Sequence, residues 1–423
     1  MTAPTGRTPA LRRGRAALGV SFFVQGAVFA LLVTRIPAIQ DRYGVSDGLL
    51  PAFLAAVPVL AGVGSLATER VVKRVRPGLV LWCSQPVACL MLVAVGSFGT
   101  LAPFAVTMGV FGLSVGALDA SMNMLGVSLQ RAYGRSIMLG FHAVYSLGGI
   151  VGASLAWWGA HQAMPLVWLY GPVVAVLGPA ALLAGRWYPD AGSGAPTPVP
   201  ATVPAEPAPV TAAGPAPVGV GLRLLLPLCL VMAFAYIGDS TVSNWSAKYL
   251  RDVLGGSEQL ATVPYNLYMV TALLGRAVGD VGVRRFGAVA VVRCGTVLAV
   301  LGFGVVAAAP GPWWGMAGFG LLGLGLCVIV PQTFAAAGRL FPEASDTAVA
   351  RLNVFNYVGF LVGSPLVGVV GDAWSYRGAM AVPLVLVAVT LLHARSFGAG
   401  PARYGGGHER PRTADVGRSG HPL

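Results

Sequence analysis

Residues 101–124 read LAPFAVTMGVFGLSVGALDASMNM, and Asp119 is the one ionisable side chain in this stretch. At 1.5 Å per residue, about 20 such residues cross the roughly 30 Å hydrocarbon core of a bilayer. Similar runs recur along a chain of 423 residues that is 56% apolar and only 10% charged. Because a soluble domain carries about 25% charged residues, the composition predicts an integral membrane protein.

Helix is the structure expected for every such run, since a helix satisfies its own backbone hydrogen bonds in lipid. The prolines inside several runs do not argue against this, because membrane helices tolerate them. The sequence therefore predicts an all-α membrane protein with twelve spans, at residues 16–34, 49–67, 79–97, 101–124, 137–158, 164–184, 224–242, 261–277, 288–309, 313–334, 349–370 and 379–393.

The net charge of +13 does not indicate a nucleic-acid protein, because the basic residues are spread between the apolar runs rather than gathered on one domain. If the N-terminus is cytoplasmic, 23 of the 28 Lys and Arg residues fall on the cytoplasmic side and 5 on the other. This asymmetry is the usual signature of membrane topology. It predicts a multi-pass plasma-membrane protein with both termini in the cytoplasm.

The cysteines and the N-terminal run offer no further chemistry. All five cysteines lie in apolar spans without metal-ligand spacing, so we expect them to be packing residues and expect no metal or cofactor. The first apolar run ends at Arg35-Ile36-Pro37 without a small-residue cleavage site, which predicts a retained helix rather than a signal peptide. No nucleophile–base set and no phosphate-binding loop occurs in the spans, so we expect neither an enzyme nor an ATP-driven pump.

The middle and the end of the chain differ from the rest. Residues 186–221 are rich in Pro and Ala and contain no span-length apolar run, which predicts a cytoplasmic linker between an N-terminal six-helix bundle, 1–185, and a C-terminal one, 222–396. The Gly- and Arg-rich residues 397–423 predict a disordered cytoplasmic tail.

The two halves are related by an internal duplication. Shifting the sequence by 211 residues places Glu69 on Asp280, followed in both halves by a pair of basic residues. The same offset aligns Gly64 with Gly275, Cys83 with Cys294, Gly112 with Gly323, His142 with Asn353, Gly148 with Gly359 and Gly152 with Gly363. A constant offset across four spans favours two pseudo-symmetric six-helix bundles.

One motif relates this duplication to a known family. Gly64-Ser-Leu66-Ala67-Thr68-Glu69, followed by Lys73 and Arg74, is an altered form of the signature G-x-L-A-D-R-x-G-R-R, with the acid one place late. The chain therefore resembles the major facilitator superfamily over nearly all of its length outside the linker and tail. The resemblance implies transport by rocking of the two halves around a central cavity.

Further motifs are similar to the rhizopine-type transporters of that superfamily. They are Arg35-Ile36-Pro37, Asp119-Ala-Ser-Met122-Asn123, Gly134-Arg135 with Phe141-His142, Asp239 before Asn244-Trp245-Ser246-Ala247, and Gly359-Phe-Leu-Val-Gly363-Ser-Pro365. The chain departs from this branch at Asp239, Asn244 and Gln130, where Glu, Asp and Glu are usual.

Ionisable groups inside a membrane cost roughly 2.5–3.5 kcal/mol each, so those retained are candidates for function. Asp119 and His142 lie on adjacent predicted helices at similar depth and could exchange a proton, or form a static tie between the helices. Asp239, near the predicted outer end of its span, could bind a proton or substrate, or be a charge paired near the surface. We predict Asp119, His142 and Asp239 as proton-coupling residues.

Neutral polar and aromatic residues in the spans suit a hydroxylated solute, although each could equally form a hydrogen bond between helices. The predicted cavity residues are Gln25, Asn123, Tyr145, Ser146, Tyr236, Asn266, Tyr268, Gln332, Asn353, Asn356 and Tyr357. The predicted cytoplasmic gate consists of local ion pairs, or else of topology anchors, among Glu69, Arg70, Lys73, Arg74, Arg135, Asp280, Arg284 and Arg285.

These features together predict a proton-coupled secondary transporter, functional as a monomer, that carries a small polar solute of sugar-like or polyol-like chemistry. A neutral solute is favoured because no strongly charged clamp is expected at mid-membrane. Two alternatives remain open: a proton-driven exporter of a hydrophobic metabolite or drug, and a membrane sensor that keeps the transporter fold without transporting.

Overall fold

The computed structural model describes residues 9–45, 50–188, 221–257, 260 and 263–398, and all its regular elements are helical. The first half contains α1 (Pro9–Thr34), α2 (Ile36–Tyr43), α3 (Leu50–Val71), α4 (Pro77–Ser97), α5 (Leu101–Tyr133), α6 (Met138–His161), α7 (Leu166–Ala184) and the short turn η1 (Gly185–Trp187). The second half contains α8 (Leu222–Lys248), η2 (Tyr249–Val253), α10 (Val263–Phe286), α11 (Ala288–Ala308), α12 (Pro312–Leu326), α13 (Ile329–Leu340), α14 (Ser345–Ala373), α15 (Tyr376–Ala379), α16 (Ala381–His393) and η3 (Ala394–Gly398).

The all-helical membrane fold expected from the sequence is confirmed. Ten helical segments of the described chain are long and apolar enough to cross a membrane. Two further long helices, α3 and α10, occupy the places of the second and eighth predicted spans. Most of the predicted linker and tail, residues 189–220 and 399–423, lies outside the described residues.

Several helices extend well beyond the apolar runs that predict them. Helix α5 continues to Tyr133 and α8 to Lys248, whereas the predicted spans end at 124 and 242. Asp119 is therefore 14 residues from the end of its helix, or about 21 Å at 1.5 Å per residue, and lies deep in the bundle. Asp239 is likewise nine residues from the end of α8. The prediction that Asp239 lies near the outer end of its span is wrong.

The predicted span 313–334 is a broken helix. Helix α12 ends at Leu326 and α13 begins at Ile329, so Cys327 and Val328 separate the two. Pro331 is the fourth residue after Cys327 and has no backbone N–H to donate to the Cys327 carbonyl. The break therefore leaves a carbonyl free for another donor inside the bundle.

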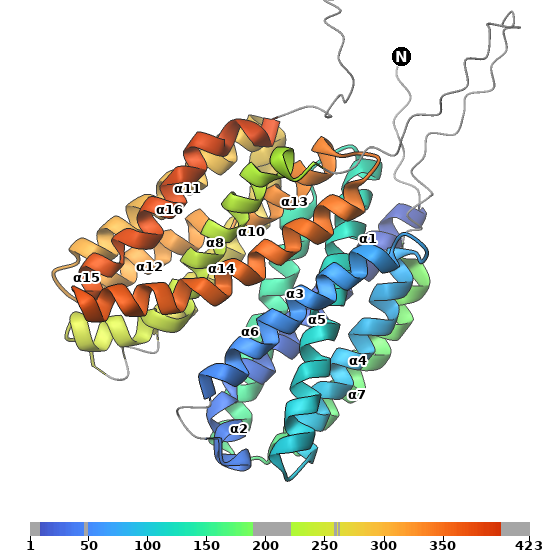
Figure 1. Ribbon diagram of the computed structural model, residues 1–423, viewed down its shortest axis with the longest axis horizontal. Coiled ribbons are helices and arrows are strands. Elements are labelled where there is room, and N and C mark those ends of the chain that lie inside the picture. Colours follow the sequence, from blue (N-terminus) through green and yellow to red (C-terminus); the bar gives the residue numbers. More distant parts are fainter. Residues whose placement is uncertain (1–8, 46–49, 189–220, 258–259, 261–262, 399–423) are drawn as a thin grey trace, which may run out of the picture.

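The two halves pack against each other along two helix pairs. Helix α14 lies against α3, and α10 lies against α6. Figure 1 shows the halves meeting at the end where α3 finishes and α14 begins, and separating towards the end that carries α2 and α15. We call these the closed end and the far end.

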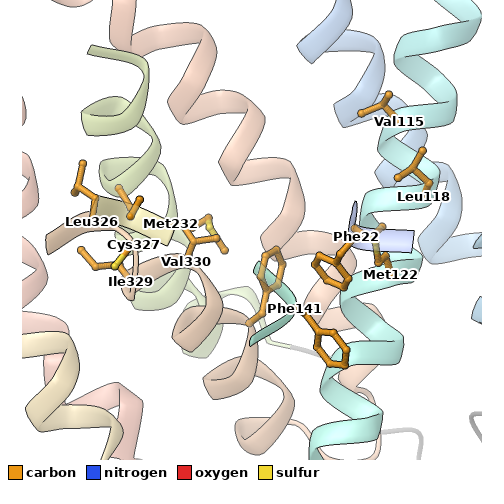
Figure 2. Close-up of a cluster of buried hydrophobic side chains, with 14 of the residues drawn as sticks. Phe22, Val115, Leu118, Met122, Phe141, Met232, Leu326, Cys327, Ile329 and Val330 are labelled. Carbon is orange, nitrogen blue, oxygen red and sulfur yellow. The ribbon is translucent and has the colours of Figure 1, made fainter. Parts of the chain in front are cut away.

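Glycines bring α1 and α6 together within the first half. A β-carbon built at Gly148 would overlap the Phe23 carbonyl oxygen, and one built at Gly26 would overlap that of Tyr145. Such small residues let backbones approach closely in membrane helix pairs. Nearby, the rings of Phe22 and Phe141 stack at 5.3 Å within the buried apolar cluster drawn in Figure 2.

This packing predicts a large stability difference between two glycine substitutions. Gly148→Ala should destabilise the fold by about 1–3 kcal/mol, because the added methyl group forces α1 away from α6. Gly171→Ala is the matched control, since a β-carbon on Gly171 would meet nothing within 4 Å. Thermal unfolding in detergent should show a lowered midpoint for Gly148→Ala alone, and equal midpoints for both variants would contradict the close packing.

Candidate functional site

Asp119 of α5 joins the two halves of the molecule. Within the first half, its carboxylate accepts a hydrogen bond from Gln25 Nε2 of α1 at 3.3 Å. From the second half it accepts bonds from two α14 side chains, Asn356 Nδ2 at 3.3 Å and Tyr357 Oη at 2.9 Å. Four candidates taken from the sequence therefore meet at one carboxylate, between helices that are far apart in the chain.

An amide network extends from this carboxylate towards the closed end. Asn356 also donates to Asn353 Oδ1 at 2.8 Å, and Asn353 donates to Ser65 Oγ of α3 at 3.3 Å. Ser65 in turn donates to the Ala350 carbonyl at 3.0 Å. Asn123 donates to the Asp119 carbonyl one turn back along α5, at 2.9 Å. The network links both halves through neutral groups.

A second, partly buried carboxylate belongs to the second half alone. Asp239 of α8 accepts a hydrogen bond of 2.5 Å from Tyr268 Oη of α10. Tyr268 is almost fully buried and stacks on Tyr265 with ring centroids 6.2 Å apart. The bond ties α8 to α10 beside the interface with the first half.

Arg276 of α10 is a central residue that the sequence analysis missed. Its guanidinium donates through Nη1 to Ser146 Oγ of α6 and through Nε to the Cys327 carbonyl at 3.4 Å. This is the carbonyl that Pro331 leaves without a partner. One guanidinium held by a hydroxyl and a carbonyl is not a charged clamp, so the absence of such a clamp stays a prediction, but an arginine inside the bundle was not foreseen.

A signal for Arg276 exists in the sequence. The residue falls inside the predicted span 261–277, but the count of basic residues by side assigned it to the following connection. Because α10 continues to Phe286, Arg276 lies ten residues before the end of its helix. Only the true length of the helix shows that the charge is internal.

His142 was expected to pair with Asp119 because the two lie at similar predicted depth, but its contacts are with other residues. His142 packs against Phe22, at 5.4 Å between ring centroids, and Phe334, at 6.4 Å. Its Nε2 has no hydrogen-bond partner among the described residues. Asp119 is instead surrounded by the amides and the phenol described above.

Several buried polar atoms near these residues lack a partner within the described chain. Gln332 of α13 is fully buried, and neither atom of its amide forms a hydrogen bond. The side-chain amide oxygens of Gln25, Asn123 and Asn356 are likewise buried and accept no hydrogen bond within the described chain. Leaving a buried polar atom unsatisfied costs about 1–3 kcal/mol. Several unsatisfied polar atoms close together are typical of a site that binds water or a polar ligand.

The remaining cavity candidates occupy different positions. Tyr145 and Tyr236 are partly buried against the core, and a β-carbon on Gly359 of α14 would lie 2.9 Å from Tyr236 Cβ. Asn266 of α10 is the one exposed residue among the cavity candidates.

The closed end is held by an ion pair between the halves rather than by local pairs. Glu69 of α3 binds Arg351 of α14 through three hydrogen bonds of 2.9–3.2 Å. Glu69 was expected to pair with its sequence neighbours Arg70, Lys73 and Arg74, but these three are exposed. A separation of 282 residues leaves no local pattern from which Arg351 could be predicted.

Asp280 also acts across the halves. It accepts hydrogen bonds from the backbone N–H groups of Leu139, at 3.4 Å, and Gly140, at 2.8 Å, and from Ser136 Oγ at 2.5 Å. An acidic side chain from α10 thus satisfies free donors in the first turn of α6, where the helix dipole favours negative charge. The expected pairing of Asp280 with Arg284 and Arg285 is wrong.

The basic residues of the predicted gate have other contacts. Arg284 donates to the Ser136 carbonyl at 3.0 Å, whereas Arg285 lies over the Phe286 ring. Arg135 lies over Tyr133 at 5.9 Å. A further tie was not predicted: Arg131 of α5 donates to the Pro342 carbonyl at 2.7 Å and to Ser345 Oγ at 2.5 Å.

These contacts predict that Glu69→Gln opens the closed end. Losing the charge of Glu69 should shift the balance between the closed and the open conformation roughly tenfold towards the open one. The reason is that hydrogen bonds to charged groups contribute about 1.5–3 kcal/mol. Leu139→Cys supplies a reporter, since Leu139 is fully buried at the closed end and packs near Gly279 of α10. Labelling of this cysteine by a water-soluble maleimide should accelerate.

Two controls make this measurement specific. Asp252→Asn breaks an exposed ion pair with Lys248, at 2.9 Å, outside the interface between the halves, and should leave the labelling rate unchanged. Exchanging the charges in Glu69→Arg with Arg351→Glu should restore slow labelling. Fast labelling in the exchanged variant would show that the pair does not hold the closed end.

Comparison with known proteins agrees with this architecture. The Major Facilitator Superfamily model matches residues 228–413. An uncharacterised MFS-type transporter of Yersinia pestis is 28% identical over 381 residues, which are 89% of this chain and 94% of the relative. The membrane protein MosC of Rhizobium meliloti is 25% identical over 89% of this chain and 88% of its own length.

Solved structures share the fold at low sequence identity. FucP, a major facilitator transporter in the outward conformation, aligns with a TM-score of 0.72 at 15% identity over 90% of this chain and 98% of its own. The human organic anion transporter TETRAN aligns with a TM-score of 0.74 at 16% identity, over 92% of this chain and 100% of its own. Together with the duplicated helical architecture, these matches show that the chain has the fold of the major facilitator superfamily.

Proposed function

We propose that this protein is a proton-coupled transporter of a small polar solute, sugar-like or polyol-like, across the plasma membrane. The observation that carries the proposal is the Asp119 carboxylate, which accepts hydrogen bonds from both halves of the molecule. The interface between the two halves must rearrange during transport. A protonatable group on this interface therefore allows proton binding to control the conformational change.

Protonation of Asp119 changes the strength of these contacts. An ionised carboxylate forms charge-assisted hydrogen bonds, which are about twice as strong as neutral ones. With Asp119 ionised, Asn356 and Tyr357 hold α14 against α5. When the carboxyl group takes up a proton, these bonds weaken and the second half is released to rock against the first.

The closed end is proposed to face the cytoplasm, with both chain termini on that side. The exposed basic residues Arg70, Lys73 and Arg74 follow α3 at this end, in agreement with the excess of positive charge on the cytoplasmic side. The described state is then outward-facing, held by Glu69–Arg351 and by Asp280 at the start of α6. One chain contains both halves of the site, so a monomer suffices.

The substrate class follows from the chemistry of the unsatisfied groups. Amide oxygens of Gln25 and Asn356 and both ends of the Gln332 amide can bind hydroxyl groups, which donate as well as accept. Arg276 adds one guanidinium, but it is already held by a hydroxyl and a carbonyl. A polyhydroxylated solute satisfies this set better than a hydrocarbon does. FucP, which is also described as a fucose:proton symporter, offers a sugar–proton precedent on the same fold.

Accumulation assays test the proposal. Proteoliposomes holding the full-length chain are given a pH gradient and a panel of labelled sugars, polyols and hydrophobic amines. At least one sugar or polyol should accumulate above its external concentration, and a protonophore should abolish the accumulation. Proton-driven movement of amines alone would indicate an exporter of hydrophobic compounds. Binding of a solute without any movement would indicate a sensor.

A further inference from the structure

We propose that a groove on the outside of the first half binds an anionic phospholipid. The groove, of about 700 Å³, lies between α1, the end of α5, α6 and α7, away from Asp119. Its polar residues are Arg12, Arg15 and Tyr133, and its other walls are apolar side chains and glycines, among them Gly19, Val20 and Val24.

The polarity of the groove changes along its length as a phospholipid requires. Arg12 and Arg15 lie in the first two turns of α1, at the closed end. Val24 lies nine residues beyond Arg15, or about 14 Å along the helix at 1.5 Å per residue. The wall between them is apolar. A charged headgroup therefore matches one end of the groove and an acyl chain matches the rest.

The arginines are available to a lipid from outside. Arg12 is exposed, and Arg15 is partly exposed with its guanidinium 5.9 Å from the centre of the Tyr133 ring. Val20 is 36% exposed, so the apolar part of the groove also opens to the surroundings of the bundle. Basic residues near a membrane surface attract anionic headgroups. A small soluble anion would contact the arginines but gain nothing from the apolar walls, and this favours a lipid.

The groove borders the contact that closes the gate. Gly140 lines it, and the N–H of Gly140 donates to Asp280 Oδ2 at 2.8 Å. Arg15 lies on the same side, with Nη2 3.6 Å from the β-carbon position of Gly140. A bound lipid would thus occupy the space next to the α6–α10 contact.

Native mass spectrometry of the full-length protein in detergent tests the headgroup. Added phosphatidylglycerol should bind more tightly than phosphatidylcholine. Arg12→Gln and Arg15→Gln should each weaken phosphatidylglycerol binding about fivefold, the effect expected for one basic residue near an anionic surface. Arg13→Gln removes the same charge from an exposed residue that does not line the groove, and should have no effect.

A second pair of variants tests the acyl-chain part. A β-carbon on Gly19 would meet nothing within 4 Å, so Gly19→Leu should fold and fill the groove, weakening both lipids. Gly171→Leu, on α7 outside the groove, is the control. Equal effects of Arg13→Gln and Arg15→Gln, or unchanged binding in Gly19→Leu, would overturn the proposal. Displacement of the lipid by equimolar inorganic phosphate would also overturn it, in favour of a phosphate site.

Discussion

Asp119→Asn is expected to reduce proton-driven accumulation of the solute by roughly two orders of magnitude. This is the lower end of the rate effect that a positioned proton-transfer group typically has. Asparagine cannot take up a proton, but it keeps the size of the side chain and one oxygen that can accept hydrogen bonds from Asn356 and Tyr357. The fold and the binding of solute should therefore persist. Only the link between proton and conformation should be lost.

Exchange assays separate these two effects. Proteoliposomes loaded with unlabelled solute should still exchange it for labelled solute in Asp119→Asn, because exchange needs no net proton movement. Asp252→Asn, which alters an exposed carboxylate away from the site, should retain both activities. Normal accumulation in Asp119→Asn would remove Asp119 from the coupling mechanism. Loss of exchange as well would assign Asp119 to solute binding.

Arg276→Gln is expected to reduce transport at least tenfold and to lower stability by about 1.5–3 kcal/mol, the contribution of a hydrogen bond to a charged group. The substitution removes the tie between α10 and Ser146 of α6 and leaves the Cys327 carbonyl without its donor. Thermal unfolding and accumulation assays measure the two effects separately.

Arg377→Gln is the matched control for Arg276→Gln. Arg377 likewise has two acceptors, the backbone carbonyls of Ala307 at 3.3 Å and Ala309 at 2.6 Å, but it follows α14 at the far end. Its loss should cost stability without the tenfold loss of transport. Equal transport by the two arginine variants would show that Arg276 has only a structural role.

Much of the fold follows from the apolar runs, because lipid exposure demands long uncharged segments and a helix is what satisfies their backbones. The ends of the helices do not follow, since α5 and α8 continue past the apolar runs into polar residues, where hydropathy marks no boundary. The expected pairing of Asp119 with His142 relied on one of these misplaced ends. Once α5 reaches Tyr133, the depth of Asp119 changes and its partners come from α1 and α14.

The contacts between the halves are beyond local sequence patterns. Glu69 and Asp280 are recognisable as duplicated acids, but their partners, Arg351 and the first turn of α6, lie in the opposite halves. The duplication does relate the two contacts: Gly140 and Arg351 are 211 residues apart, as Glu69 and Asp280 are. The symmetry could have suggested both pairs if one of them had been known.

The most direct test of the central claim is to record the pH inside proteoliposomes when solute is added without any imposed gradient. If solute and proton move together, adding a transported sugar or polyol should acidify the lumen, at a rate that increases with the amount of reconstituted protein. Entry of the labelled solute with no change in internal pH would contradict proton coupling through Asp119.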